Sequence, residues 1–147
     1  MRIISGSKKS FIVRAPRNLP VRPTTDKVKE SLFNIIQNKY EFSSLKVLDI
    51  FAGTGNISYE FGSRGCSDIL CIDNNIKCVK FIDKTAKNLN IKVRTKKIDY
   101  LSFLNQNNEK FDIVFADPPY SFSLDNYLNI IDLIKKNEIL KAEGQLI

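Results

Sequence analysis

The chain has 147 residues, 43% of them hydrophobic and 27% charged, which is typical of one globular domain large enough for a real core. It has no histidine, and Cys66, Cys71 and Cys78 lack C-x-x-C spacing, so neither a zinc site nor a histidine-based triad is expected. No apolar run approaches the roughly 18 residues of a membrane span, and a signal-peptide core is missing, so we expect a cytoplasmic protein without membrane or metal partners.

The net charge of +7 lies almost entirely in the first 22 residues. This segment carries +6 and the remaining residues carry +1. Residues 2–4 and 11–13 predict two short strands around a turn at 5–7. A basic hairpin indicates a polyanionic partner; the alternative is a solvated, frayed terminus. The expected contact residues are Arg2, Lys8, Lys9, Arg14, Arg17 and Arg22.

A helix is predicted next, because Thr24 or Thr25 can cap it and Asp26 suits its positive end. Its expected apolar face is Val28, Leu32, Ile35 and Ile36.

Strands and helices then alternate along the rest of the chain. Apolar runs predict strands at 46–51, 68–73, 92–98 and 111–116, and helical spacing predicts helices at 56–64, across 79–89 and across 127–134. This order predicts an α/β fold with a doubly wound, mostly parallel sheet. We expect a hairpin arm at 1–22 and one α/β domain at 23–147.

Residues 140–147 look like a turn that enters a further strand. A doubly wound sheet of this kind usually continues beyond that point. We therefore expect a truncated C-terminus, the alternative being a sheet edge covered by another chain.

The first strand is followed by a glycine turn that enters a helix. Such glycines let a ligand approach the backbone. A dinucleotide fingerprint would need Gly or Ala at position 58, which is Ser58. Asp49 beneath the turn would repel a pyrophosphate and suits an amine or a sulfonium, both of which S-adenosylmethionine carries. The candidate residues are Asp49, Phe51, Ala52, Gly53, Thr54 and Gly55.

Two further carboxylates end the next strands. Asp73, followed by Asn74, lies where an acidic residue commonly binds ribose hydroxyls. Asp99, followed by Tyr100, could accept a hydrogen bond from an adenine amino group. Three carboxylates at successive strand ends indicate a ligand site on that rim more strongly than any one of them.

Asp117-Pro118-Pro119-Tyr120 follows the fourth strand, where ligands bind in open α/β sheets. The prolines fix two φ angles and remove two N–H donors, so the segment presents rigid acceptors beside an aromatic ring. Such a cluster suits a flat molecule with an amino group, such as a nucleobase.

These motifs together resemble the RsmD family, bacterial methyltransferases that act on a guanine N2 of 16S ribosomal RNA. The resemblance rests on Arg2-Ile3-Ile4-Ser5-Gly6, Arg22-Pro23-Thr24-Thr25-Asp26-x-x-x-Glu30-x-x-Phe33, Asp49-x-Phe51-Ala52-Gly53-Thr54-Gly55, Ser63-Arg64-Gly65 and Asp117-Pro118-Pro119-Tyr120. It implies a Rossmann-like methyltransferase domain at 23–147, S-adenosyl-L-methionine as cofactor, and ribosomal RNA or the small ribosomal subunit as partner. We expect a monomer.

The resemblance also implies residue roles. Asp49 to Gly55 would line the methionine end of the cofactor, with Thr24 and Thr25 closing over it. Asp73 would hold the ribose and Asp99 would face the adenine. The catalytic segment, Asp117, Pro118, Pro119 and Tyr120, would hold the target base.

Other acceptors and roles stay open. The same tetrapeptide would serve an adenine N6 in DNA or a protein glutamine. A nucleic-acid-binding module without catalysis is the alternative from another class, and a nicotinamide-dependent oxidoreductase is weakened by Asp49 and Ser58.

Overall fold

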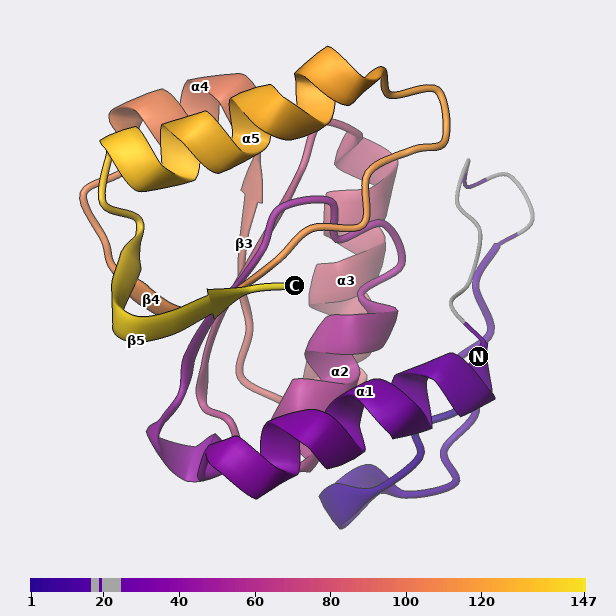
Figure 1. The fold of residues 1–147 in the computed structure, drawn as a ribbon. Helices are drawn as coiled ribbons and strands as arrows, with labels where there is room; N and C mark the ends of the chain where they lie inside the picture. The colour runs from indigo at the N-terminus through magenta and orange to yellow at the C-terminus, as the bar shows by residue number, and fades with distance from the viewer. Residues whose placement is uncertain (17–18, 20–24) are drawn as a thin grey trace.

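The computed structural model describes residues 1–16, 19 and 25–147 (Figure 1). Thr24, Arg17 and Arg22, which the sequence marked as candidates, lie outside these residues. The elements in chain order are η1 (Gly6–Lys8), α1 (Asp26–Lys39), η2 (Phe42–Ser44), β1 (Lys46–Asp49), α2 (Asn56–Ser63), β2 (Asp68–Asp73), α3 (Ile76–Leu89), β3 (Arg94–Lys97), α4 (Tyr100–Gln106), β4 (Phe111–Phe115), α5 (Leu124–Lys136) and β5 (Leu140–Leu146).

The five strands form one sheet in the order β3-β2-β1-β4-β5, and all neighbouring pairs are parallel. The predicted α/β fold with a doubly wound sheet is therefore confirmed. β5 pairs with β4, with a register irregularity between Phe111 and Ile113. The strand expected near the end of the chain is thus present. In the described residues, no helix combines the length and the apolar character that crossing a membrane requires.

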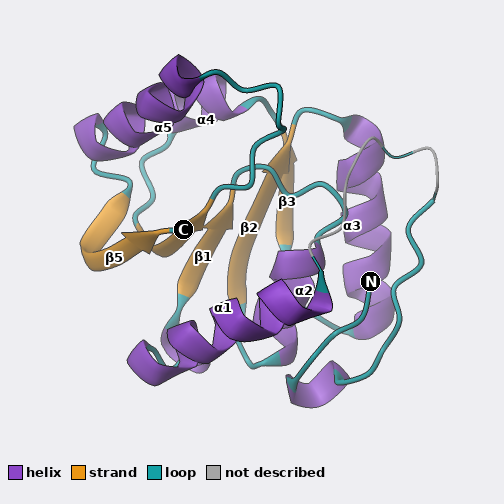
Figure 2. Cartoon of the chain, turned by 45° about the vertical axis from the view of Figure 1, so that its right-hand side comes forward, coloured by secondary structure: helices purple, strands orange, loops and turns teal. Residues whose placement is uncertain are grey.

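Successive strand residues face opposite sides of the sheet, as the two-residue period requires. Val47 packs in a core with α1, α2 and α3, whereas Leu48 packs in a second core with α4 and α5. Figure 2 shows these two helical layers on either side of the strands. Both faces of β1, β2 and β4 are covered, so these three strands are mostly apolar, which is why their apolar runs predicted them well.

The buried face of α1 differs from the prediction. Phe33 and Ile36 are buried, but Val28 and Ile35 are 57% and 69% exposed. Fully buried Lys29 occupies the core side instead. The apolar pattern missed this face because a charged residue takes part in it.

Helix α4 was not predicted at all. It has two buried apolar residues, Phe103 and Leu104, too few to give a period. Its start is nevertheless encoded, because the Asp99 side chain accepts a hydrogen bond from the Ser102 amide at 2.9 Å and so caps the helix.

The N-terminal arm is fastened to α2 rather than paired as two full strands. A single antiparallel bridge joins Arg2 and Ile12 around η1. The Glu60 carboxylate on α2 accepts hydrogen bonds from the amides of Ile4 and Ser5 at 2.8 and 3.0 Å. Gly6 has φ +82°, and a Cβ there would clash with the Ser63 carbonyl. The first 13 residues are therefore held against α2.

Candidate active site at the carboxyl edge of the sheet

A cavity of about 840 Å³ opens where β1, β2 and β4 end. This is the edge at which parallel α/β sheets bind ligands. Most of the residues marked from the sequence line it: Thr25, Phe51, Ala52, Gly53, Thr54, Asp73, Asn74, Asp99, Tyr100, Asp117, Pro118, Pro119 and Tyr120. The fold thus brings together candidates that lie more than 90 positions apart in the chain.

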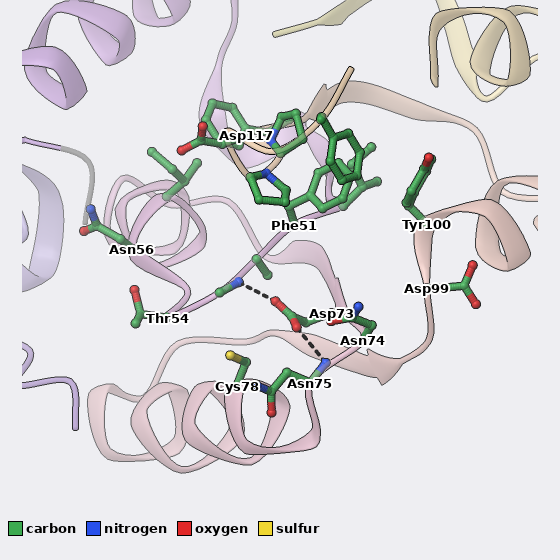
Figure 3. A pocket seen from close by; sticks show the side chains of 18 of the residues that line it. Phe51, Thr54, Asn56, Asp73, Asn74, Asn75, Cys78, Asp99, Tyr100 and Asp117 are labelled. Atoms are coloured by element: carbon green, nitrogen blue, oxygen red, sulfur yellow. Dashed lines mark hydrogen bonds between the residues drawn. The ribbon is translucent and has the colours of Figure 1, made fainter. Parts of the chain in front are cut away.

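Asp73 is held firmly at the end of β2. Its carboxylate accepts one hydrogen bond from the Gly53 amide and one from the Asn75 amide, both at 2.8 Å (Figure 3). A carboxylate can accept about four hydrogen bonds, so capacity for two hydroxyl groups remains. Asp73 therefore both anchors the glycine turn and offers the acceptor that a ribose needs.

The glycine turn depends on a left-handed residue. Gly55 has φ +76°, and a Cβ at this position would lie 2.8 Å from the Tyr59 ring. The Gly55 amide donates to the Ala52 carbonyl at 2.7 Å, which closes the turn. Gly53 and Thr54 line the cavity. Gly55 is not part of the cavity lining.

Asp49 also lies behind the turn rather than on the cavity wall. Its side chain is buried and accepts a hydrogen bond from Ser58 Oγ at 2.8 Å. Burial raises its pKa to about 7, and the negative charges of Asp73 and Asp117 add to the rise. Ser58, which breaks the dinucleotide fingerprint, thus serves as the hydrogen-bonding partner of Asp49. Direct contact of Asp49 with a ligand amine stays a prediction.

One wall of the cavity is aromatic. The rings of Phe51, Tyr100 and Phe122 pack together, with centroids 5.3 to 5.6 Å apart. Such a surface suits a flat, weakly polar ring. Sequence analysis missed Phe122, which lies between the Pro-Pro segment and the Ser123 that caps α5. Its place in this wall depends on how the loop before α5 folds back, which no pattern in the sequence indicates.

Asp99 lies at the far end of this wall. The hydrogen bond from the Ser102 amide lowers the pKa of its carboxyl group. Asp99 therefore stays ionised at neutral pH and can accept a further hydrogen bond while it caps α4.

The segment from Asp117 to Tyr120 lines the cavity, and its first residue, Asp117, lies across from Asp73 and Cys78 (Figure 3). The Pro119 carbonyl accepts a hydrogen bond from the Phe122 amide at 3.0 Å, so the loop closes on itself. Tyr120 is 85% exposed at the cavity rim, where a second flat molecule could contact its ring.

A buried polar group supports the cavity from α1. Lys29 Nζ donates to Asn56 Oδ1 at 2.8 Å and to the Arg2 carbonyl at 2.5 Å, and it lies 3.5 Å from Glu60. Burial lowers the Lys29 pKa, against the opposing charge of Glu60. Asn56 lines the cavity, so this group joins the arm to the site. No pattern in the sequence predicted this buried polar group.

The described basic residues of the arm lie outside the cavity lining. Arg2 pairs with Asp26 at 3.1 Å, while Lys9 and Arg14 are exposed and Lys8 is partly buried.

The shape and chemistry of the cavity fit S-adenosylmethionine. Asp73 offers acceptors for two hydroxyl groups, the aromatic wall offers a surface for a flat base, and the glycine turn exposes backbone.

Comparisons with known proteins point the same way. The family model described as conserved hypothetical protein 95 matches residues 1–147. YlbH of Bacillus subtilis is 33% identical over 152 residues, which cover 100% of this chain and 80% of YlbH. Ribosomal RNA small subunit methyltransferase D of Haemophilus influenzae is 31% identical over 98% of this chain and 75% of its own length.

Among solved structures, yhhF from Escherichia coli superposes with a TM-score of 0.86. The match covers 99% of this chain and 78% of that chain, at 28% identity.

Proposed function

This chain belongs to the RsmD/YhhF family of S-adenosylmethionine-dependent methyltransferases, and we propose that it methylates the exocyclic N2 of a guanine in small-subunit (16S) ribosomal RNA. Family membership makes the reaction a methyl transfer and the cofactor S-adenosylmethionine. The acceptor and the roles of individual residues are the proposal. A relative named as a ribosomal RNA small subunit methyltransferase supports ribosomal RNA of the small subunit as the substrate.

The cofactor would be held by residues at the ends of β1, β2 and β3. Asp73 would accept hydrogen bonds from the ribose, and Phe51 and Tyr100 would contact the adenine beside Asp99. Bound there, S-adenosylmethionine supplies an electrophilic methyl group on a sulfonium.

The acceptor nitrogen needs help from the protein, because its lone pair is delocalised into the guanine ring. Asp117 and the Pro118 carbonyl can accept its two N–H hydrogen bonds, which turns the lone pair out of conjugation. The Asp117 carboxylate also stabilises the positive charge that builds on nitrogen as the new N–C bond forms. The resulting ammonium is strongly acidic and releases a proton, so no histidine base is required.

Tyr120 would hold the extruded base. Stacking of a base on an aromatic side chain contributes about 1–3 kcal/mol, which offsets part of the cost of unstacking it from the RNA. The exposure of Tyr120 at the rim supports this role, since its ring is accessible from outside.

One observation carries the proposal. The four residues from Asp117 to Tyr120 line the same cavity as Asp73 and the glycine turn. A donor site and an acceptor site in one cavity are what direct methyl transfer requires.

A methylation assay tests it. Radiolabelled cofactor is supplied with undermethylated small ribosomal subunits, naked 16S ribosomal RNA or duplex DNA, and the modified nucleotide is identified by mass spectrometry. We expect N2-methylguanine in one of the two RNA substrates. The Asp117→Asn variant, purified in the same way, is the control and should show little turnover. Label confined to DNA would establish the adenine alternative. Absence of S-adenosylmethionine binding by calorimetry, from a folded sample, would favour a nucleic-acid-binding module.

A further inference from the structure

The positive charge of this protein has a second centre besides the arm. Residues 76–97 contain eight Lys or Arg and one acidic residue, a net charge of +7. Since the arm carries +6 and the whole chain +7, the other 103 residues carry −6. The near-neutral charge of residues 23–147 is therefore the sum of a basic segment, 76–97, and an acidic remainder.

Four of these lysines form a stripe along α3. Lys77, Lys80, Lys84 and Lys87, here called the α3 stripe, are spaced by three, four and three residues, which places them on one helix face. They are exposed, whereas the opposite face holds the buried residues Cys78, Val79, Ile82, Ala86 and Leu89. At about 1.5 Å per residue, the stripe extends over about 15 Å.

The neighbouring edge strand continues this surface. β3 is at the end of the sheet, and its Lys96 and Lys97 are exposed, as is Lys92 before it. Asp83, the acidic residue of the segment, accepts a hydrogen bond from Thr95 Oγ1 at 2.7 Å, which ties α3 to β3.

These lysines have no acidic partners in the part of the chain that the structure describes. None of the four stripe lysines, nor Lys92, Lys96 or Lys97, forms an ion pair there. Residues 17–18 and 20–24 contain no acid that could pair with them. Elsewhere, exposed lysines do find carboxylates, as Lys110 does with Glu138 at 2.7 Å. Like charges three and four residues apart on a helix destabilise it slightly, so stability does not explain the stripe.

The stripe begins at the cavity. Asn75 and Cys78, at the start of α3, line the cavity, and Lys77 lies between them in sequence. Figures 1 and 2 both show residues 1–16 on the same side of the molecule as α3, away from β5. The described part of the arm and α3 therefore lie on one side of the molecule.

We propose that the α3 stripe, with Lys92, Lys96 and Lys97, is a docking surface for the phosphate backbone of the RNA substrate. This rests on the proposed function. Its charges are spread along a helix and do not converge, so they suit an elongated polyanion rather than a single phosphate. Ile76 is the one large apolar residue of α3 that is strongly exposed, so the stripe lacks the apolar face that inserts into a lipid surface.

The test compares two double variants of equal charge. Lys80→Gln/Lys84→Gln removes two stripe lysines, and Lys135→Gln/Lys136→Gln removes two exposed lysines from the end of α5. Binding of 16S ribosomal RNA is measured at several salt concentrations, and S-adenosylmethionine binding is measured by calorimetry. We expect the stripe variant to bind RNA about tenfold more weakly. The magnitude of the slope of log affinity against log salt should fall by about 2, and cofactor affinity should not change. Lys80→Arg/Lys84→Arg should keep wild-type RNA binding.

Equal losses in the two Gln variants, or an unchanged salt slope in the stripe variant, would overturn the proposal. So would a stripe variant that binds RNA normally but loses affinity for anionic vesicles. If the wild-type protein still methylates ribosomal RNA in these cases, the docking surface alone is wrong. If the wild type neither binds nor methylates RNA, the proposed function fails as well.

Discussion

The Lys29 ammonium lies 3.5 Å from a carboxylate oxygen of Glu60, and both side chains are fully buried. Glu60 also accepts a hydrogen bond from Arg64 Nε at 2.9 Å and holds the arm through the amides of Ile4 and Ser5. Two cations and the arm thus depend on one carboxylate. Glu60 therefore has more partners than Lys29, and we expect its loss to cost more stability.

Glu60→Gln should destabilise the protein more than Lys29→Met. Removing Glu60 leaves two cations, Lys29 and Arg64, without their shared counter-charge, which costs about 3–5 kcal/mol. Removing Lys29 leaves Glu60 paired with Arg64 and mainly costs the hydrogen bonds to Asn56 and Arg2, about 1–3 kcal/mol. Urea denaturation of both variants measures the difference, and the reverse order would contradict this account.

Asp73→Ala should weaken S-adenosylmethionine binding about tenfold or more. The change removes the charged acceptor for the ribose and releases the Gly53 amide. A hydrogen bond to a charged group is worth about 1.5–3 kcal/mol, and 1.4 kcal/mol is tenfold in affinity. Calorimetry gives the dissociation constant. Asp68→Ala, at the other end of β2, is the matched control and should bind cofactor normally.

Asp117→Asn should abolish most turnover and leave cofactor affinity intact. The charge that stabilises the developing ammonium is lost, which by analogy with other electrostatic stabilisers costs about 10²–10³ in kcat. Single-turnover methylation and calorimetry separate the two effects. Asp125→Asn, on the first turn of α5, is the control: it makes the same change of charge outside the cavity lining and should keep normal turnover. Full activity of Asp117→Asn would disprove its role.

Tyr120→Ala should raise KM for RNA, while Tyr120→Phe should behave like the wild type, because stacking needs the ring and not the hydroxyl. The expected loss is about 1–3 kcal/mol, roughly 5- to 150-fold. Steady-state kinetics on ribosomal RNA checks this prediction, and equal effects of the two substitutions would speak against stacking.

Asp49 should make the protein less stable as pH rises from about 4 to about 7. Burial raises its pKa from the usual 3.8 to about 7, so in this window the folded state keeps a proton that the unfolded state has lost. Each pKa unit is worth about 1.4 kcal/mol, so the loss amounts to a few kcal/mol. Denaturation at pH 5 and pH 8 should show a smaller drop for Asp49→Asn. An equal drop would assign the pH dependence to other groups.

The sequence predicted β1, β2 and β4 well because these strands are mostly buried and apolar, whereas the edge strand β3 is polar and largely exposed. It failed where charged or polar residues take core positions. In α1, the charged residue Lys29 takes a buried position that the apolar pattern assigned to other residues. The role of Ser58 depends on its hydrogen bond to Asp49, which the sequence pattern does not indicate. The candidate rim could be predicted from carboxylates at strand ends, since parallel strands bring those ends together. Phe122 could not, because its place depends on how the loop before α5 folds back.

The sheet order carries a last consequence. The chain winds outward from β1 to β3, then returns to the other side of β1 for β4 and β5. Apart from Phe122, which joins the aromatic wall, residues before β4 therefore build the half of the cavity assigned to the methyl donor, and residues after it build the half assigned to the recipient. Because the two halves are consecutive stretches of one gene product, the second can diverge toward a new recipient while the first stays as it is.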